Sequence, residues 1–339
     1  MKYLIVILSF FIFSRLHAQD TTFRKPVIVS KEITRVALGD TYHYAIQAMD
    51  SSSRPVSFSI KQLPTWLSYN ETTHTISGKA VKVGQYPITI TVSNLHKKTA
   101  HHFILTVYNQ QTNNILCLGN SLTNGTNKYN SYRRDLWQIL HKANYNFDFI
   151  GSWNKHHGGG AVPDDDFDTD HDGHSGWTID NMFNPPDWDS IRGNINKWLT
   201  EYKPDIVLIE LGTNDVFQCV KVADMITKLD QLVQTLRKKN SMAKIFIAQI
   251  PPLGQQWAPK KLCGDSIAYE TVIKDLNKQI RLYSQMANKK TSPVRAVDQF
   301  TGVNPATDMY DDIHPNDSGE KIMAKRWFDA IHGYIKKLP

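Results

Sequence analysis

The stretch ILCLGNSL (residues 115–122) decides how the larger part of the chain folds. Its first four residues are apolar and predict a buried strand, and the Gly-Asn-Ser turn that follows places a hydroxyl group at the carboxyl end of that strand. A serine hydroxyl is too weakly acidic to attack by itself, so it needs a base, and the base needs an orienting acceptor. The segment DDIHP (residues 311–315) offers both, which makes hydrolysis the first functional hypothesis.

From residue 114 onwards, apolar runs alternate with stretches of helical periodicity. We expect strands at residues 114–118, 147–150, 205–211, 244–249 and 293–298, and helices near residues 130–142, 189–201, 222–239, 266–288 and 317–335. Strands separated by helices form a parallel sheet that helices cover on both faces. Ligands of such sheets bind beyond the carboxyl ends of the strands, where the serine turn and the segments GTND (212–215) and DDIHP all lie.

The preceding region, residues 26–109, alternates apolar and polar residues with a period of two and has no helical period. Alternate residues from Tyr86 to Val92 share one face of a strand, and short turn segments separate such strands. The pattern predicts a small all-β sandwich, and the region resembles the immunoglobulin-like or cadherin-like domains attached to secreted bacterial enzymes. Trp66 suits either the core of this sandwich or an exposed sugar-binding platform.

The composition and the first residues of the chain indicate where in or outside the cell the protein is located. The chain has 339 residues, of which 41% are hydrophobic, which suffices for two packed cores. Residues 1–18 combine Lys2, an apolar stretch at 3–13 and a small residue at Ala18, so we expect a secretory signal, with a buried core segment as the alternative. Cleavage near Ala18 predicts a secreted or periplasmic protein whose mature form does not insert into a membrane.

The basic excess of the chain gives no nucleic-acid patch. The formal net charge is +7, and removal of the signal would lower it to about +5. The largest basic cluster, residues 237–239, suits a solvated helix end better than a nucleic-acid site. Cys117 is expected to be a buried thiol, whereas Cys219 and Cys263 lie in loops where an oxidising compartment would permit a disulfide. The sequence leaves that bridge open.

Two segments far apart in the chain supply the parts of a catalytic triad. Ser121 is the candidate nucleophile, His314 the candidate base and Asp311 the candidate orienter. Asp312 is a rival orienter that adjacency alone does not exclude. Serine is also a common helix cap, and the Asp and His residues could be ordinary loop residues before the last helix.

An oxyanion needs hydrogen-bond donors that point to where negative charge develops. The backbone N–H groups of Ser121 and Gly176 and the side-chain amide of Asn214 could supply three such donors. Gly176 lies in GHSGW (173–177), and glycine suits a place where the backbone approaches a substrate closely. An ordinary turn glycine is the alternative.

Short motifs carry a resemblance to a known superfamily. The motifs are GNSL (119–122), SGW (175–177), GTND (212–215) and DDIHP (311–315). They resemble those of the SGNH hydrolases, also called GDSL esterases. Longer stretches such as DHDGHSGWTID (170–180) resemble carbohydrate esterase family 3, which is associated with deacetylating xylan. The resemblance covers about residues 113–337.

The resemblance implies a flavodoxin-like, three-layer α/β/α parallel sheet, the SGNH hydrolase fold, with no metal or organic cofactor. It assigns Ser121, Asp311 and His314 to the triad, and Ser121, Gly176 and Asn214 to the oxyanion hole. The implied function is a secreted serine esterase that removes O-acetyl groups from xylan-like carbohydrate through an acetyl-enzyme. A lipase or thioesterase of the same superfamily and a non-catalytic carbohydrate-binding protein are the alternatives.

Position 120 departs from the family pattern, because Asn120 stands where the family usually has aspartate. In such folds this residue hydrogen-bonds around the nucleophile loop and does not react. Asparagine can therefore take its place, although the change alters the local electrostatics.

Aromatic side chains near the expected cleft could stack on sugar rings. They are Trp153, Trp177, Trp188 and Trp257. Trp177, next to Gly176, is the best candidate, with a core role as the alternative. Asn120 and Gln218 are further candidates for the substrate pocket, and the alternative for Gln218 is an ordinary loop residue.

Other chemistries find no support in the sequence. It contains no CxxC, no HExxH and no phosphate-cradling glycine-lysine loop. The segment DTDHDG (168–173) imitates the first half of a calcium loop, but the twelfth position is Ile179 instead of glutamate. We expect a hydrated acidic loop there in preference to a calcium site.

Overall fold

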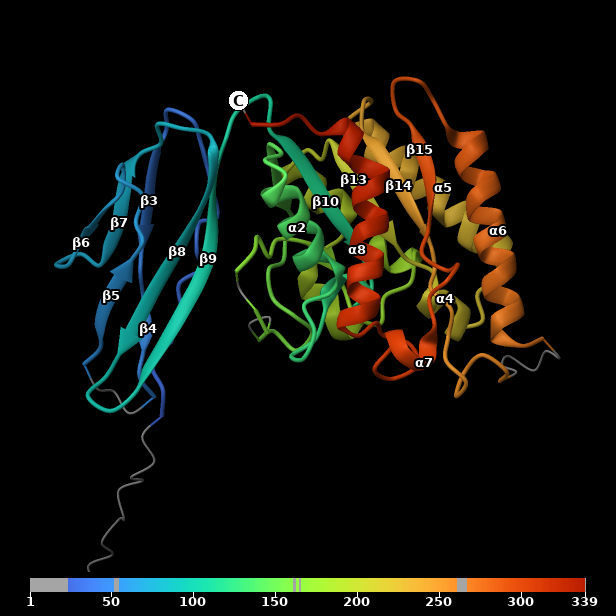
Figure 1. Ribbon diagram of the computed structural model, residues 1–339, viewed down its shortest axis with the longest axis horizontal. Helices are drawn as coiled ribbons and strands as arrows, with labels where there is room; N and C mark the ends of the chain where they lie inside the picture. Colours follow the sequence, from blue (N-terminus) through green and yellow to red (C-terminus); the bar gives the residue numbers. More distant parts are fainter. Residues whose placement is uncertain (1–23, 52–54, 161–162, 165, 261–266, 339) are drawn as a thin grey trace, which may run out of the picture.

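The computed structural model describes residues 24–51, 55–160, 163–164, 166–260 and 267–338. The predicted signal segment at 1–18 and Cys263, one of the two cysteines of the predicted disulfide, lie outside these residues. The described chain forms a β-domain and an α/β domain that lie side by side (Figure 1). Within the described residues, no helix has both the length and the apolar character that crossing a bilayer would require.

The β-domain is built from short strands, as predicted. They are β1 (Val27–Ile28), β2 (Arg35–Ala37), β3 (Thr41–Ala45), β4 (Ala48–Met49), β5 (Ser57–Lys61), β6 (Ser68–Asn70), β7 (Thr75–Lys79), β8 (Gly84–Ser93) and β9 (Lys98–Tyr108). One sheet has the order β2-β9-β8-β5 and another the order β3-β7-β6, while β1 pairs with β4. Side chains from both larger sheets, such as Tyr44, Ile76 and Ile90, share one core.

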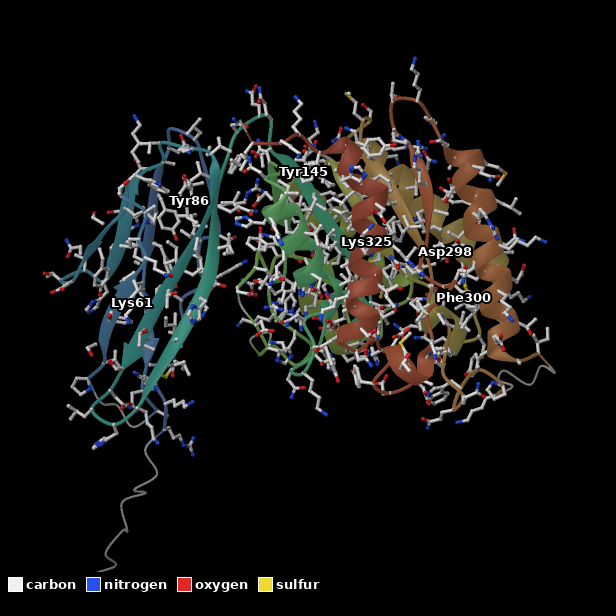
Figure 2. All side chains as sticks on the ribbon, in the orientation of Figure 1. Lys61, Tyr86, Tyr145, Asp298, Phe300 and Lys325 are labelled. Carbon is white, nitrogen blue, oxygen red and sulfur yellow. The ribbon has the colours of Figure 1, made fainter. Side chains whose placement is uncertain are left out.

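Packing between the two sheets explains the alternation in the sequence. Ile88 and Ile90 of β8 are 1% exposed or less, and their neighbours in the strand point away from the core. Figure 2 shows side chains filling the space between the sheets, where Tyr86 is labelled. Trp66 is partly buried against this core and meets Tyr86 edge-on, with 5.6 Å between the ring centroids. This contact favours the core role of Trp66 over the sugar platform.

The sheet of the α/β domain pairs its strands in parallel. Its strands are β10 (Asn113–Gly119), β11 (Phe147–Ile150), β12 (Asp172–Gly173), β13 (Ile206–Glu210), β14 (Lys244–Gln249) and β15 (Val294–Asp298). Their order is β11-β10-β13-β14-β15, and β12 pairs with the end of β10. This is the flavodoxin-like order, in which ligands bind at the carboxyl ends beside the first strand. The sequence did not reveal β12, because a two-residue strand has no periodic signal.

Helices cover both faces of this sheet. They are α1 (Ser121–Asn124), α2 (Tyr132–Lys142), α3 (Ile195–Glu201), α4 (Thr213–Phe217), α5 (Val222–Lys239), α6 (Tyr269–Ala287), α7 (Pro305–Asp308) and α8 (Asp317–Ile331), with 3₁₀ turns η1 (Asp180–Met182), η2 (Asp187–Arg192) and η3 (His332–Tyr334). The core on one face includes side chains of α3, α5 and α6, and the core on the other includes side chains of α2 and α8. The predicted three-layer arrangement is therefore confirmed (Figure 1).

The helix predicted at residues 189–201 is divided into η2 and α3. Gly193 between them has a φ of +78°, which glycine adopts without strain. Asn194 then caps α3 by accepting a hydrogen bond from the backbone N–H of Lys197 at 3.1 Å. Because of this break, η2 does not continue into α3.

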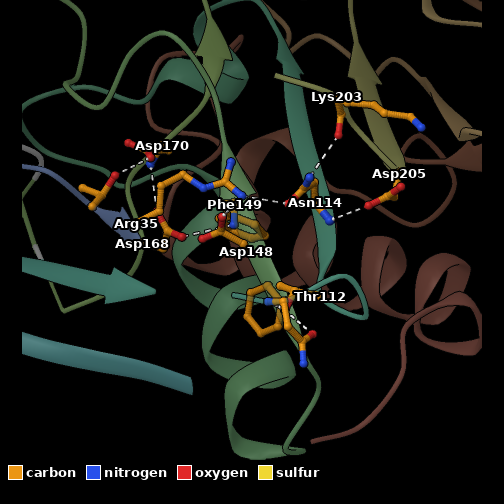
Figure 3. Close-up of polar contacts among 12 residues, drawn as sticks. Arg35, Thr112, Asn114, Asp148, Phe149, Asp168, Asp170, Lys203 and Asp205 are labelled. Atoms are coloured by element: carbon orange, nitrogen blue, oxygen red, sulfur yellow. Dashed lines mark hydrogen bonds and ion pairs between the residues drawn. The ribbon is translucent and has the colours of Figure 1, made fainter. Parts of the chain in front are cut away.

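The β-domain contacts the α/β domain at the edge strand β11 (Figure 3). Arg35 of β2 forms an ion pair with Asp148 of β11 at 3.0 Å and donates to the side chain of Asn114 at 3.1 Å. Thr34 donates from its hydroxyl to the carboxylate of Asp170 at 3.0 Å. These contacts attach the β-domain to the segment that leads into β12.

Candidate active site

Ser121 begins the short helix α1 directly after β10. Gly119, at the end of β10, has no room for a side chain, because a Cβ there would overlap Oγ1 of Thr123. Asn120 caps the helix: its side-chain oxygen accepts a hydrogen bond from the N–H of Leu122 at 2.9 Å. Asparagine thus provides the same acceptor as the aspartate usual in the family. The tight turn leaves the hydroxyl of Ser121 at the carboxyl edge of the sheet.

Ser121, His314 and Asp311 form a continuous chain of hydrogen bonds. Oγ of Ser121 lies 2.8 Å from Nε2 of His314, and Nδ1 of His314 lies 2.8 Å from Oδ2 of Asp311. In this arrangement Nδ1–H donates to the carboxylate and Nε2 accepts from the hydroxyl. The imidazole can therefore take up the hydroxyl proton while the carboxylate stabilises the resulting charge.

The geometry distinguishes the two neighbouring aspartates. Oδ1 of Asp311 accepts the backbone N–H groups of Ile313 and His314 at 3.1 and 2.7 Å, so the turn holds Asp311 and His314 as one unit. Asp312 is directed elsewhere: its carbonyl accepts the N–H of Gly254 at 2.8 Å, and its carboxylate occupies the space where a Cβ of Gly254 would lie. Asp311 is the aspartate that contacts His314.

Gly176 is the exposed residue of a mostly buried loop at the end of β12, the Gly176 loop (residues 173–179). Its φ of +81° is one that glycine adopts without strain. β12 pairs with β10 through Gly173 and Gly119, and the N–H of His174 donates to the carbonyl of Gly119 at 2.9 Å. These bonds hold the Gly176 loop beside the turn of Ser121. In the described part of the chain, the backbone N–H groups of Ser121 and Gly176 donate to no protein acceptor.

Asn214 and Asp215, at the start of α4, fasten the Gly176 loop to β13. The side-chain nitrogen of Asn214 donates to the carbonyl of Trp177 at 2.9 Å, and the carboxylate of Asp215 accepts the N–H of Ile179 at 3.1 and 3.2 Å. An amide nitrogen carries two hydrogens, so Asn214 keeps a second N–H for another acceptor. Burial raises the pKa of Asp215 to about 6, against the lowering effect of these backbone hydrogen bonds.

A buried polar cluster supports the Gly176 loop. The ring of His174 is stacked between Trp177 and Trp198, with centroid distances of 4.2 and 4.9 Å. Burial lowers the pKa of His174 to about 3, so this ring stays neutral. Burial also raises the pKa of Asp172 to about 7, although the hydroxyl of Tyr202 donates to it. Asp172, His174 and Trp177 are buried, so they support the loop from inside the protein and do not meet solvent.

Another buried carboxyl group lies in the strand next to the nucleophile turn. Glu210, at the end of β13, is paired with Gly119 of β10, and its carbonyl accepts the N–H of Asn120. Burial raises the pKa of Glu210 to about 8, and neither carboxyl oxygen has a hydrogen-bond partner among the described residues. Glu210 therefore keeps its proton at neutral pH and adds no charge to the core.

Two of the predicted substrate contacts are wrong. Trp177 is 0% exposed, and its indole nitrogen donates to Asp189 at 3.0 Å, so its ring has no free face for a sugar. Asn120 is also 0% exposed and serves as the cap of α1. Gln218 is exposed at the end of α4, and its contact with a substrate stays a prediction.

The other tryptophans near the site differ in what covers them. Trp153 lies under the guanidinium group of Arg192, 3.4 Å from the ring centroid. Trp257 meets Phe217 edge-on at 5.4 Å. Trp188 is 67% exposed and lies against Gly176. The sequence pointed to Trp177 because it follows Gly176 in the chain, whereas the fold brings Trp188 to Gly176 in space.

The acidic segment at 168–173 is mostly buried, with only Thr169 and Asp170 half-buried, which corrects the prediction of a hydrated loop. Asp168 is 3% exposed and accepts the N–H of Phe149 at 3.1 Å. Burial and repulsion from Asp148 raise the pKa of Asp170 to about 7, although the hydroxyl of Thr34 donates to it. Among the residues that the structure describes, no three His, Cys, Asp or Glu side chains are grouped so that they could hold a metal ion.

The sheet order and the serine, histidine and aspartate at its carboxyl edge define an α/β protein with the SGNH hydrolase fold. The chain belongs to the GDSL-like Lipase/Acylhydrolase family, whose model matches residues 117–322. Residues 25–108 match the family described as "Putative Ig domain". The predicted resemblances of both domains are thereby confirmed.

Several relatives share the α/β domain. The multidomain esterase of Ruminococcus flavefaciens is 31% identical over 238 residues, which are 66% of this chain and 29% of that protein. The chain therefore spans less than a third of the length of this curated relative. A carbohydrate esterase family 3 protein from Talaromyces cellulolyticus is 27% identical, with a TM-score of 0.52 over 66% of this chain and 97% of that one.

Two further solved structures are similar over the same domain. The family 3 carbohydrate esterase of Clostridium thermocellum is 26% identical, with a TM-score of 0.50 over 64% of this chain and 94% of that one. A mutant acetyl esterase solved with an acetate ion is also 26% identical, with a TM-score of 0.52 over 66% of this chain and 97% of that one.

Proposed function

We propose that the protein is a secreted or periplasmic serine esterase that removes O-acetyl groups from carbohydrate through an acetyl-enzyme. The observation that carries this proposal is the hydrogen-bonded chain from Ser121 through His314 to Asp311, with 2.8 Å at each of its two links. Serine, histidine and aspartate in this relation activate an alcohol for attack on an ester carbonyl.

In the first half of the reaction, Oγ of Ser121 bonds to the acetyl carbonyl carbon while Nε2 of His314 takes the hydroxyl proton. The carbonyl electron pair moves to the oxygen and gives a tetrahedral oxyanion. The oxyanion then collapses, the bond to the sugar oxygen breaks, and that oxygen leaves with the proton from His314. Asp311 stabilises the imidazolium at Nδ1 and stays ionised.

In the second half, His314 takes a proton from a water molecule, whose oxygen attacks the acetyl group on Ser121. A second oxyanion forms and collapses, the bond between the acetyl carbon and Oγ breaks, and His314 returns its proton to Oγ of Ser121. The product leaves as acetic acid, which loses its remaining proton to solvent. Both oxyanions need donors, and the free N–H groups of Ser121 and Gly176 and the second amide hydrogen of Asn214 fill that role. Each such donor contributes about 3 kcal/mol of transition-state stabilisation.

The acetylated carbohydrate substrate is proposed from the relatives. The similar solved structures include carbohydrate esterase family 3 proteins and an acetyl esterase holding an acetate ion. Export is proposed from residues 1–18, whose charged start, apolar stretch and Ala18 have the form of a secretory signal.

The test compares wild-type protein with Ser121→Ala. We expect acetate release from acetylated xylan, pectin, sialic acid or chitin fragments to fall about 10⁶-fold. The Tm should not change, because the hydroxyl group is small and only half-buried. Ser57→Ala, in the β-domain, is the matched control and keeps full activity. Retained turnover by Ser121→Ala contradicts the proposal, and a preference for octanoyl over acetyl esters favours the lipase alternative.

A further inference from the structure

Trp188 is the one tryptophan whose ring lies mostly in solvent. The chain has eight tryptophans, all within the described residues, and Trp188 alone is more than half exposed, at 67%. Trp177, Trp198 and Trp327 are 1% exposed or less. An indole is among the largest apolar side chains, so leaving it in water forgoes about 2 kcal/mol of burial. An exposed ring of this size offers an apolar face on which a ligand can stack.

The position of Trp188 ties it to the candidate active site. A Cβ atom at Gly176 would lie 3.5 Å from Cη2 and 3.7 Å from Cζ2 of the indole, so the six-membered ring of Trp188 borders Gly176. The N–H of Gly176 is one of the proposed oxyanion donors. An ester whose carbonyl oxygen reaches Gly176 therefore has the rest of its molecule within reach of Trp188.

The turn that carries Trp188 is held rigidly. Asp189 accepts hydrogen bonds from Nε1 of Trp177 at 3.0 Å and from Nε of Arg192 at 2.9 Å. Arg192 covers the ring of Trp153, and its carbonyl accepts Nε1–H of Trp198 at 2.8 Å. Contacts with three other tryptophans therefore hold Asp189 and Arg192 in place, while the ring of Trp188 itself stays uncovered. A ring presented in this way loses little freedom when a ligand binds.

We infer that Trp188 forms the platform on which the sugar ring of the substrate stacks while its acetyl group occupies the oxyanion site. The inference rests on the proposed function. A pyranose has an apolar C–H face that stacks on an indole, and hydroxyl groups at its rim that need polar neighbours. Within η2, Asp187 and Ser190 are exposed and polar, and Ile191 is 92% exposed. The turn therefore presents both apolar and polar surface, as the face and the rim of a sugar ring require.

Different residues recognise the two parts of the substrate. Ser121, Gly176 and Asn214 act on the acetyl group, which every acetyl ester has. Trp188 acts on the alcohol part, so it discriminates between a sugar ester and a ring-free ester. Loss of the indole should therefore change the preference among substrates, which a purely structural role would not do.

The experiment measures kcat/KM for acetylated xylo-oligosaccharide and for ethyl acetate, which has no ring, in wild type, Trp188→Ala and Trp188→Phe. In Trp188→Ala the ratio of the two constants should fall about 10- to 100-fold, mainly through KM for the oligosaccharide. Trp188→Phe keeps an aromatic face and should restore most of the ratio. Leu95→Ala, which alters an exposed residue of the β-domain, leaves the ratio unchanged.

Binding supplies a second readout in a protein that does not turn over. Isothermal titration of Ser121→Ala with the acetylated oligosaccharide should give a Kd that rises about 10-fold or more when Trp188→Ala is added. An unchanged ratio and an unchanged Kd overturn the inference, as does an equal loss on both esters. Wild-type protein that hydrolyses neither ester contradicts the proposed function itself, and one that hydrolyses ethyl acetate alone contradicts the carbohydrate part and the platform.

Discussion

The two loops that combine aspartate with histidine, residues 168–174 and residues 311–314, have opposite surroundings. In the first loop, the side chains of Asp172 and His174 are 0% and 1% exposed. In the second loop, the side chains of Asp311 and His314 are 40% and 23% exposed. The two loops read alike in the sequence, yet one lies inside the protein and the other at the carboxyl edge of the sheet.

The difference shows how burial divides the same residue types between support and chemistry. The buried loop has a supporting role. His174 packs between two indoles and its pKa is lowered to about 3, so it does not gain a proton at neutral pH. His314 instead contacts an alcohol at one nitrogen and a carboxylate at the other, with solvent access for a substrate. A base needs an accessible proton donor as well as an acceptor partner.

The largest expected effect separates the two histidines. His314→Ala removes the proposed base and should lower kcat/KM for acetyl esters about 10⁴-fold or more without changing the Tm. His174→Ala leaves a gap between Trp177 and Trp198 and should cost about 3 kcal/mol of unfolding free energy, while the folded fraction stays active. Urea unfolding and acetate release measure both quantities.

A matched pair of variants sharpens the contrast between these histidines. Phenylalanine fills the space of an imidazole without its nitrogens, so His174→Phe should keep most of the stability and His314→Phe should stay inactive. A stable, active His314→Phe protein would show that the catalytic assignment is wrong. An inactive but stable His174→Phe protein would show that the buried loop takes part in the chemistry.

The next effect separates the two aspartates of the loop 311–314. Asp311→Asn replaces the acceptor of Nδ1–H and should lower kcat about 10⁴-fold at neutral pH, because the imidazole loses its orienting charge. Asp312→Asn changes a side chain that packs beside Gly254 and should have a much smaller effect. Steady-state kinetics of both variants with one acetyl ester shows which aspartate orients His314. Equal losses of kcat in the two variants would contradict the geometry.

The smallest effect concerns the buried loop 168–174 and its dependence on pH. Asp170 has a pKa of about 7, raised by burial and by repulsion from Asp148, against an ordinary value of 3.8. The folded state therefore holds this proton more tightly than the unfolded state. Stability from this group is greatest below about pH 4 and declines as the pH rises to about 7.

Asp170→Asn removes that charge and leaves an amide oxygen that can still accept the hydroxyl of Thr34. The stability advantage of the variant over wild type should therefore grow by about 1 kcal/mol or more between pH 5 and pH 8. Urea unfolding at both pH values measures the difference, with Asp275→Asn on the surface of α6 as the control. A variant that loses stability at pH 8 would show that the carboxylate is needed in its charged form.

Much of the α/β domain could be predicted because its signals are local. Strands such as β13 and β14 are buried over nearly their whole length and appear as apolar runs, and α5 and α8 carry apolar residues at helical spacing. A parallel sheet brings the carboxyl ends of its strands to one edge. Ser121, Asn214 and His314 follow from that rule although they are far apart in the chain.

The rest depended on contacts that the sequence does not encode locally. Which tryptophan is exposed depends on what covers it: Trp177 packs against His174, whereas nothing among the described rings stacks on Trp188. The burial of Asp170 depends on Thr34, which lies 136 residues earlier in another domain. The break at Gly193 depends on a positive φ that a helical pattern does not reveal.

The most direct test of the central claim is to trap the acyl group on the enzyme. Wild-type protein is mixed rapidly with an acetyl ester, quenched in acid, digested and analysed by mass spectrometry. The account predicts one acetyl group on the peptide that contains Ser121, absent from Ser121→Ala and short-lived in wild type. An acetyl group on another side chain, or hydrolysis without any acetylated peptide, would contradict it.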